Sequence, residues 1–419
     1  MSHLRITGGR PLRGEIAVQG AKNSVLPILS ATILCADTCR IRCCPRLDDV
    51  DAAAEILQYL GCAVRWEGGD LVVDSSRMTG CHIPRYLMEK MRSSVIFLGP
   101  LLARFGEASL SYPGGCQLGP RPIDLHLKAL RAMGAEIRED GGHLLCRARH
   151  LHGAEISLPI PSVGATENIL LAGCGAAGTT ILTGAAREPE IQDLQSFLVR
   201  CGAQVSGAGG HTVAVVGRQP LHGCDHRCIG DRIAAATYLC AAAATGGQIG
   251  LLGVEQCHLG AVCRVLQRCG CAMRQEEGFL ALRGPERLQG ANIIATAPFP
   301  GFPTDAQAIL MAALCRADGA TMMVENLFDS RFRHVPELRR MGAHIRCQGR
   351  TAVVYGVETL HGAAMHATDL RGGAALVVAA LQAEEPSAID EIHHIQRGYE
   401  DIARDIRALG GHIDFVADG

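Results

Sequence analysis

The sequence predicts an α/β fold built from six repeated units of about 70 residues, arranged as two domains of three units. Three recurring features support this prediction. A helix ends at an apolar residue and a glycine before a strand, a Leu-x-Gly tripeptide precedes a short alternating stretch, and each unit has one helix rich in small residues. The chain has 419 residues, too many for one ordinary core, so two domains are expected.

The first feature is the junction between a helix and a strand, as in Met133-Gly134-Ala135-Glu136-Ile137. A glycine just past a helix end is the expected left-handed cap. The six junction glycines are Gly61, Gly134, Gly202, Gly270, Gly342 and Gly410, with spacings of 73, 68, 68, 72 and 68 residues. This period is too long for a solenoid repeat and suits a small αβ subdomain.

The second feature is the Leu-x-Gly tripeptide. It occurs at residues 12–14, 151–153, 221–223, 288–290 and 360–362. Most copies lead into a short alternating stretch, such as Glu15-Ile16-Ala17-Val18, which is typical of a strand. If the chain termini lie close together, the first and last units must exchange segments.

The third feature is a helix that is apolar nearly all round and should therefore be buried. The polar starts of the six helices are residues 21–24, 91–94, 162–167, 231–232, 304–305 and 368–371. Asp231, Thr304 and Thr368 suit the role of N-caps. Lys22, Arg92 and Arg371 do not, because a cation at a helix N-terminus opposes the helix dipole. Such cations are better explained by a bound anion, held together with the helix N–H groups.

Composition excludes several classes of function. Apolar residues make up 48% and charged residues 20% of the chain, as in an ordinary globular protein. The formal net charge of −2 provides no field that would attract nucleic acid or a membrane. No apolar run reaches 18 residues and no signal-type apolar segment follows Met1, so we expect a cytoplasmic protein.

The 19 cysteines are expected to be reduced and mostly buried, as in the apolar surroundings of Cys174, Cys240 and Cys315. Two groups of cysteine and histidine residues have a composition that metal sites can use. Cys35, Cys39, Cys43 and Cys44 lie near a predicted helix end and strand. His222, Cys224, His226 and Cys228 alternate along a predicted strand, where they would form a line and not a tetrahedron. We expect no metal at either group.

The segment from Ser111 to Pro122 has three glycines and three prolines in twelve residues, which excludes a regular helix or a central strand. It carries Cys116 near its middle and Arg121 five residues later. One interpretation is a surface turn with an incidental thiol. The other is a shaped loop in which Arg121 favours the reactive thiolate and holds an anion.

Several motifs in order connect this chain with a known family. They are Gly20-Ala21-Lys22-Asn23, Pro113-Gly114-Gly115-Cys116, Gly119-Pro120-Arg121-Pro122, Ala186-Arg187-Glu188-Pro189-Glu190-Ile191, Phe302-Pro303-Thr304-Asp305, residues 331–338, Ala367-Thr368-Asp369-Leu370-Arg371 and Arg397-Gly398-Tyr399-Glu400. From Ile6 to near the C-terminus, the chain resembles the UDP-N-acetylglucosamine 1-carboxyvinyltransferases of the enolpyruvyl transferase family.

The resemblance implies a fold of two inverse αβ barrels, each of three repeated units, with the active site in the cleft between them. It places the domains at residues 22–229 and at residues 1–21 plus 230–419. The implied reaction transfers the enolpyruvyl group of phosphoenolpyruvate to the 3′-hydroxyl of UDP-N-acetylglucosamine by addition and elimination, with release of phosphate. This is the first committed step of peptidoglycan precursor synthesis.

Catalytic roles follow from the resemblance. Cys116 is the expected general acid and covalent nucleophile, and the expected target of an anionic epoxide such as fosfomycin. Asp305 is expected to bind the sugar hydroxyl and take its proton. Lys22 and Arg397 are expected to hold phosphoenolpyruvate, and Asp369 to move a proton or orient Arg371. Taken alone, Asp305 could equally be an N-cap, and any single arginine a surface ion pair.

The expected substrate-binding residues are Lys22, Asn23, Arg92, Arg121, Pro122, Ile123, Asp124, Leu125, Ser162, Val163, Gly164, Asp305, Leu327, Arg331, Arg371 and Arg397. No GxxxxGK[ST] phosphate loop occurs, which argues against nucleotide hydrolysis. The scheme requires no metal and no cofactor, and we expect a monomer or weak oligomer. Two alternatives are the sister transferase acting on shikimate 3-phosphate and a non-catalytic sugar-nucleotide sensor. A sensor predicts loss of Cys116, Asp305 or Arg397, and all three are present.

Overall fold

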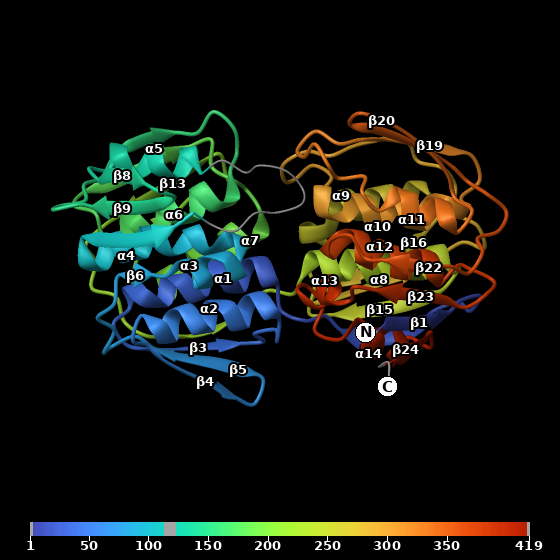
Figure 1. The fold of residues 1–419 in the computed structure, drawn as a ribbon, viewed down its shortest axis with the longest axis horizontal. Helices are drawn as coiled ribbons and strands as arrows, with labels where there is room; N and C mark the ends of the chain where they lie inside the picture. Colours follow the sequence, from blue (N-terminus) through green and yellow to red (C-terminus); the bar gives the residue numbers. More distant parts are fainter. Residues whose placement is uncertain (1–2, 113–122, 417–419) are drawn as a thin grey trace. The chain divides into compact units, whose positions relative to one another are not determined.

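The computed structural model describes residues 3–112 and 123–416, which form two compact units (Figure 1). The terminal unit comprises the described residues up to 19 and from 230 onward, and the middle unit those from 20 to 229. Within each unit, helices lie in the interior and sheets lie outside them. None of the helices in the described ranges is long and apolar enough to cross a membrane.

The middle unit shows the repeat in its simplest form. One repeat runs β10 (Glu155–Ser157), α6 (Val163–Gly175), β11 (Thr179–Thr183), α7 (Pro189–Arg200), β12 (Gln204–Ser206) and β13 (Thr212–Val216). The sheet order is β10-β11-β13-β12, with β10 parallel to β11 and the other neighbours antiparallel. The other five four-stranded sheets have the same arrangement. The prediction of an α/β fold of six similar units is confirmed.

The other two repeats of the middle unit share this plan. One contains β6 (His82–Ile83), α3 (Arg85–Lys90), η2 (Arg92–Phe97), α4 (Leu98–Phe105), β7 (Glu107–Ser111), α5 (Asp124–Ala132), β8 (Glu136–Asp140) and β9 (His143–Arg147). The other contains β14 (Asp225–Arg227), α1 (Lys22–Ala31), η1 (Thr32–Leu34), β3 (Thr38–Arg42), α2 (Asp48–Tyr59), β4 (Ala63–Glu67) and β5 (Asp70–Asp74).

The terminal unit also contains three repeats. The first has β2 (Arg13–Ala17), α8 (Arg232–Ala244), β15 (Gln248–Leu252), α9 (Gln256–Arg268), β16 (Ala272–Glu276) and β17 (Phe279–Arg283). The second has β18 (Asn292–Ala295), α10 (Thr304–Ala313), η3 (Leu314–Arg316), β19 (Ala320–Val324), α11 (Val335–Arg340), β20 (His344–Gln348) and β21 (Thr351–Tyr355). The third has β22 (Ala364–His366), α12 (Leu370–Ala380), β23 (Ser387–Asp390), α13 (His393–Gln396), α14 (Ile402–Ala408), β24 (His412–Val416) and β1 (His3–Thr7).

The beginning of the chain contributes a strand to the last repeat, as expected if the first and last units exchange segments. β1 pairs with β23 and β24 from the end of the chain, and β14 completes the first sheet of the middle unit. Backbone hydrogen bonds fix both chain crossings: Ala21 N–H donates to the Ile229 carbonyl at 2.8 Å, and Asp231 N–H donates to the Gln19 carbonyl at 2.9 Å. Each unit therefore closes its own sheets with strands that are distant in sequence.

Two sets of glycines explain the sequence pattern. The six junction glycines have φ between +81° and +99°, which confirms the predicted left-handed caps. The Leu-x-Gly glycines permit close approach of neighbouring backbone segments of the same chain. A Cβ on Gly153 would lie 2.2 Å from the Thr179 carbonyl oxygen, and one on Gly223 would lie 1.9 Å from that of Thr38. No side chain fits in such a gap.

The six polar-ended helices are buried as predicted, and in the terminal unit α8, α10 and α12 pack against one another. Asp231 caps α8, accepting from the N–H groups of Ile233 and Ala234. The capping predictions for Thr304 and Thr368 are wrong. Thr304 Oγ1 donates to Glu325 instead, and Asp369 caps α12 because its carboxylate lies one residue closer to the free N–H groups.

The junction glycines yield a stability prediction. Gly61→Ala should lower the free energy of unfolding by about 1 kcal/mol, because alanine resists the left-handed conformation while its Cβ meets only ordinary contacts. Gly69→Ala is the matched control in the same unit, with no positive φ and open space around its Cβ. Urea denaturation of both variants checks this; equal stability of the two would contradict the proposed cap.

Candidate active site

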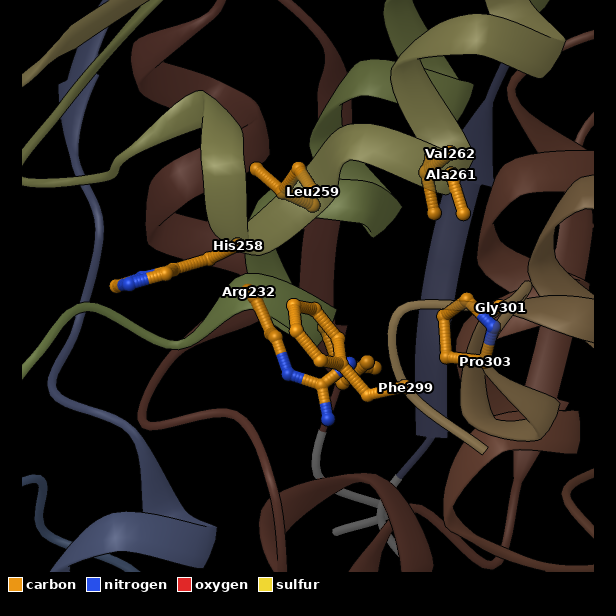
Figure 2. A pocket seen from close by; sticks show the side chains of 9 residues that line it. Arg232, His258, Leu259, Ala261, Val262, Phe299, Gly301 and Pro303 are labelled. Carbon is orange, nitrogen blue, oxygen red and sulfur yellow. The ribbon is translucent and has the colours of Figure 1, made fainter. Parts of the chain in front are cut away.

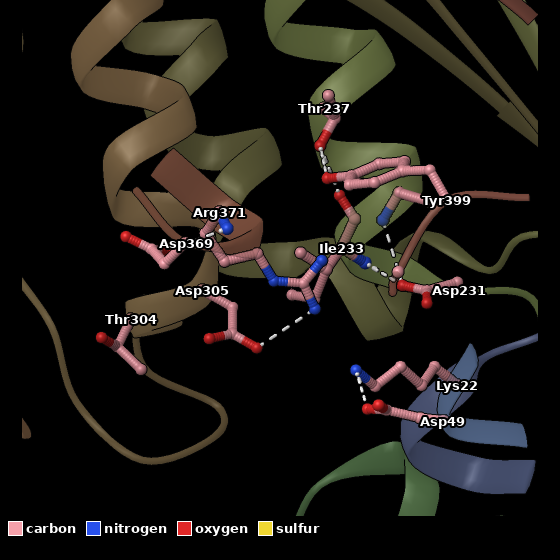
Figure 3. A network of polar contacts seen from close by, with 12 residues as sticks. Lys22, Asp49, Asp231, Ile233, Thr237, Thr304, Asp305, Asp369, Arg371 and Tyr399 are labelled. Atoms are coloured by element: carbon pink, nitrogen blue, oxygen red, sulfur yellow. Dashed lines mark hydrogen bonds and ion pairs between the residues drawn. The ribbon is translucent and has the colours of Figure 1, made fainter. Parts of the chain in front are cut away.

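Asp305 lies in the first turn of α10 between two buried arginines. Its Oδ1 pairs with Arg331 Nη2. Its Oδ2 pairs with Arg371 Nη2 at 3.3 Å (Figure 3). The Arg331 and Arg371 side chains are 3% and 6% exposed, whereas that of Asp305 is 31% exposed. Arg331 Nε also donates to the Thr304 carbonyl at 3.2 Å, which fixes the guanidinium at the helix start. The result is a partly open carboxylate backed by two cations.

Arg371 stands in the first turn of α12, and Asp369 caps that helix. Asp369 accepts from the N–H groups of Arg371 at 3.1 Å and Gly372 at 3.0 Å. Burial lowers the pKa of the Arg371 guanidinium, but Asp305, Tyr399 and Asp231 outweigh this effect and raise it, so the side chain stays charged. The Tyr399 hydroxyl lies 2.7 Å from Thr237 Oγ1 (Figure 3), and burial raises its pKa.

His334 lies fully buried beside this group. Burial lowers the pKa of its imidazole to about 4, an effect that the charge of Arg331 reinforces and that of Asp369 opposes. Neither ring nitrogen has a hydrogen-bond partner. His334 is therefore neutral at neutral pH, and it adds no third positive charge behind Asp305.

Glu325, just after β19, organises the turn that leads to Arg331. Its carboxylate accepts from Thr296 Oγ1 at 3.0 Å and Thr304 Oγ1 at 2.9 Å. It also accepts from the backbone N–H groups of Leu327 and Phe328 at 2.9 Å and 3.1 Å. One buried carboxylate thus holds both the start of α10 and the segment containing Leu327.

Gln19 holds the segment that contains Arg397. Its side-chain amide donates to the Gly398 carbonyl at 3.0 Å, and its side-chain oxygen accepts from the Glu400 N–H at 2.9 Å. Arg397 is half-buried at the end of α13, next to this clamp. The N-terminal segment therefore positions a residue almost 380 positions later.

In the middle unit, Lys22 is the first residue of α1, and no side chain caps that helix. Its Nζ lies 2.6 Å from Asp49 Oδ2 in the first turn of α2 (Figure 3), and both side chains are largely buried. A buried ammonium group needs such a counter-ion. The pair holds a positive charge at the N-terminal end of α1, where the helix N–H groups also favour an anion.

Asn168 in α6 connects this helix by hydrogen bonds to η2, α4 and α5 of the same unit. Its side-chain nitrogen donates to the Val95 carbonyl at 2.9 Å and to His126 Nδ1 at 2.8 Å. Its oxygen accepts from the Gly99 N–H at 2.7 Å. A Cβ on Gly164 would lie only 3.0 Å from the His126 ring, so glycine allows the start of α6 to approach α5 closely. Residues 123–125 and 162–164 are thus brought together.

A buried acidic residue lies on α6. The Glu167 side chain has its pKa raised to about 8, first by burial and then by the charges of Glu190 and Glu188. Pro189 is the first residue of α7, and Glu188 occupies the N-cap position without a capping side-chain hydrogen bond. Near neutral pH, Glu167 therefore carries a proton for most of the time.

A small hollow lies beside Asp231. Its lining includes Arg232 at the start of α8, His258, Phe299 and Pro303 (Figure 2). The Arg232 guanidinium lies 5.8 Å from the centre of the Phe299 ring. The free volume is about 10 Å³, enough for roughly one water molecule. This hollow cannot hold a sugar nucleotide.

Comparison with known proteins assigns the family. The sequence model of the EPSP synthase (3-phosphoshikimate 1-carboxyvinyltransferase) family matches residues 6–406. The chain belongs to the EPSP synthase family. Full-length relatives named UDP-N-acetylglucosamine 1-carboxyvinyltransferase include one from Dichelobacter nodosus, 45% identical with 100% of both chains covered. Another, from Carboxydothermus hydrogenoformans and numbered 1, is 46% identical with 99% of both chains covered.

Solved structures of the EPSP synthase family share the fold. The enolpyruvyl transferase NikO from Streptomyces tendae has a TM-score of 0.89 and 26% identity, covering 100% of this chain and 99% of its own. EPSP synthase from Acinetobacter baumannii has a TM-score of 0.77 and 20% identity over 99% of this chain and all of its own, which supports the fold alone.

The expected site residues of this family member fall into three groups. The terminal unit brings Asp305, Arg331, Asp369 and Arg371 together and holds Leu327 and Arg397 through Glu325 and Gln19. The middle unit places Lys22, Asn23, Arg92, Ile123, Asp124, Leu125, Ser162, Val163 and Gly164 at helix starts. Cys116, Arg121 and Pro122 lie outside the described residues.

Some expected residues have additional structural roles. Ser162 caps α6 by accepting from the Ala165 N–H at 3.4 Å. Asp124 is partly engaged by Lys128 at 3.5 Å, four residues later on the same exposed helix face. The cysteines expected to be inert are buried, and burial raises the pKa of the Cys174 and Cys315 thiols to about 12.

Sequence reasoning missed Gln19, Asp49, Asn168 and Glu325, which position the substrate-binding candidates. Asp49 had a local signal, because three aspartates cluster in the first turn of α2. Gln19, Asn168 and Glu325 act through contacts with distant segments. No local pattern identifies such partners.

His126 yields a prediction of pH dependence. Burial lowers the pKa of His126 from 6.5 to about 4. Between pH 6.5 and pH 4, its imidazole is therefore protonated in the unfolded chain and neutral in the folded chain. This contribution to stability is present above pH 6.5 and falls by about 2 kcal/mol on going from pH 7 to pH 5. His126→Gln should remove this part of the slope, as measured by urea denaturation at several pH values.

The exposed His211→Gln variant, in the same unit, is the control and should keep the wild-type pH dependence. If His126→Gln and His211→Gln showed the same slope, the buried imidazole would not be the source of acid sensitivity.

Proposed function

We propose that this chain is a UDP-N-acetylglucosamine 1-carboxyvinyltransferase, which transfers the enolpyruvyl group of phosphoenolpyruvate to the sugar 3′-hydroxyl and releases phosphate. The observation that carries the proposal is the similarity over the whole chain to relatives of that name, at 43% to 46% identity. The proposed reaction takes place in the cytoplasm and begins peptidoglycan precursor synthesis. It uses soluble small-molecule substrates and no cofactor.

Asp305 is the proposed base for the sugar hydroxyl. Its carboxylate is partly exposed, and Arg331 and Arg371 hold it at the start of α10. Phosphoenolpyruvate is an anion and competes for these guanidinium groups. We propose that its binding loosens one ion pair, so that a carboxylate oxygen becomes available to accept the hydroxyl proton. Asp369 supports this arrangement by capping α12 and thereby fixing Arg371.

The remaining charges of phosphoenolpyruvate are assigned to Lys22, Arg92, Arg121 and Arg397. Lys22 is held by Asp49, which orients its ammonium group at the N-terminal end of α1. Cys116 is the proposed proton donor to the enol carbon and the nucleophile of a covalent adduct. Residues 123–125, 162–164 and 327 are proposed to contact the nucleotide, because the first two groups form adjoining helix starts.

An assay with two acceptors tests the function. Phosphate release from phosphoenolpyruvate should require UDP-N-acetylglucosamine and should not occur with shikimate 3-phosphate. The second acceptor is relevant because the family description names 3-phosphoshikimate. Release with shikimate 3-phosphate alone would replace the proposal by the sister activity. Binding of the sugar nucleotide without phosphate release would indicate a sensor.

Asp305→Asn should lower kcat on the order of 10²- to 10⁴-fold, because the amide cannot accept the hydroxyl proton. The exposed Asp318, in the same unit, provides the control Asp318→Asn, which should keep wild-type kcat. Steady-state phosphate release measures both variants, and thermal unfolding shows whether Asp305→Asn remains folded. A folded Asp305→Asn variant with undiminished kcat would exclude Asp305 as the base.

A further inference from the structure

Four cysteines converge in the middle unit, away from the residues assigned to the reaction. Cys35 follows η1, Cys39 lies in β3, Cys201 ends α7, and Cys224 directly precedes β14. Cys35, Cys39 and Cys201 are buried, and Cys224 is half-buried. We call these residues the four-cysteine cluster. Its members come from four separate segments of the chain.

Three of the four sulfur atoms lie close enough together to share one ion, and the fourth contacts two of them. Those of Cys35, Cys39 and Cys201 are all within 4.8 Å of one another. Cys224 Sγ lies 3.3 Å from Cys201 Sγ, and its thiol also contacts that of Cys39. A tetrahedral Zn²⁺ with bonds of about 2.3 Å places its four sulfur ligands about 3.8 Å apart. The separation of 3.3 Å between the Cys201 and Cys224 sulfur atoms is close to this value.

The sequence contains part of this signal in two separate places. Cys35 and Cys39 belong to the group of cysteines at residues 35–44, and Cys224 belongs to the group of alternating histidines and cysteines at residues 222–228. The second group by itself forms a line along a strand and does not close a tetrahedron. The fold combines two ligands from one group with one ligand from the other and adds Cys201. The Cys35-x₃-Cys39 spacing is typical of zinc ligands contributed by one segment.

We propose that the four-cysteine cluster binds one structural Zn²⁺ ion through four thiolates. The four thiols lose their protons to solvent as four Zn–S bonds form, with no change in oxidation state. Cys224 stands next to β14, the edge strand that pairs with β3. The metal would fasten this edge strand to β3 and to the ends of η1 and α7, which stabilises the unit.

Metal analysis of the full chain, purified without chelators, tests the proposal. We expect about one zinc per chain, released as four thiolates are titrated with a mercurial reagent. Replacement by Co²⁺ should give visible absorption bands of tetrahedral thiolate coordination. Iron in place of zinc would overturn the proposal. A purified protein that contains no metal, and in which all 19 cysteines react as free thiols after denaturation, would also overturn it. So would disulfides within the cluster.

Cys39→Ser tests the site, and Cys174→Ser is its matched control. Cys174 is also buried in the middle unit, and it does not belong to the cluster. Cys39→Ser should lose nearly all bound zinc, and Cys174→Ser should retain it. If Cys39→Ser does not fold, removal of zinc from the wild-type chain by a strong chelator should still lower its melting temperature. An unchanged zinc content in folded Cys39→Ser, or no effect of the chelator, would contradict the proposal.

Discussion

The structure depends on the burial of helices that are apolar nearly all round. Such a helix has no solvent-facing side, so its charged residues lie near its ends, and its free N–H groups need partners there. Asp231, Ser162 and Asp369 supply these partners directly. Lys22 and Arg371 instead place cations at helix starts and are balanced by nearby carboxylates. Charges therefore gather at the ends of these helices, where an anionic substrate can be held.

The charged groups of the terminal unit's site form ion pairs, and each pair determines which of its groups is available to a ligand. Arg331 and Arg371 are buried and both pair with Asp305, so a single carboxylate connects the two guanidinium groups. His334, close by, stays neutral because burial disfavours its charged form. An anion that enters such a site competes with Asp305 for the cations. The proposed mechanism therefore couples substrate binding to the availability of Asp305 as the base.

Residues that position the site come from distant parts of the chain. Gln19 holds the backbone on both sides of Tyr399, and β14 completes a sheet begun about 180 residues earlier. The terminal unit is built from segments before and after the middle unit in sequence, and its strand β1 pairs with β23 and β24 from the end of the chain. A truncation at either end of the chain would therefore remove β1 or β24 from one four-stranded sheet.

The sequence by itself determined the six repeats, the left-handed glycine caps and the buried helices with polar ends, because each depends on residues close together in the chain. It also indicated Asp305, Arg331, Asp369 and Arg371 through motifs of a known family. Only the tertiary structure showed that Asp369 caps α12, that Asp49 pairs with Lys22, and that Glu325 and Gln19 hold the site segments. It also joined Cys35 and Cys39 with Cys201 and Cys224. The physical reason is that these partners meet only when sheets and helix ends from distant segments pack together, and no local periodicity encodes such a meeting.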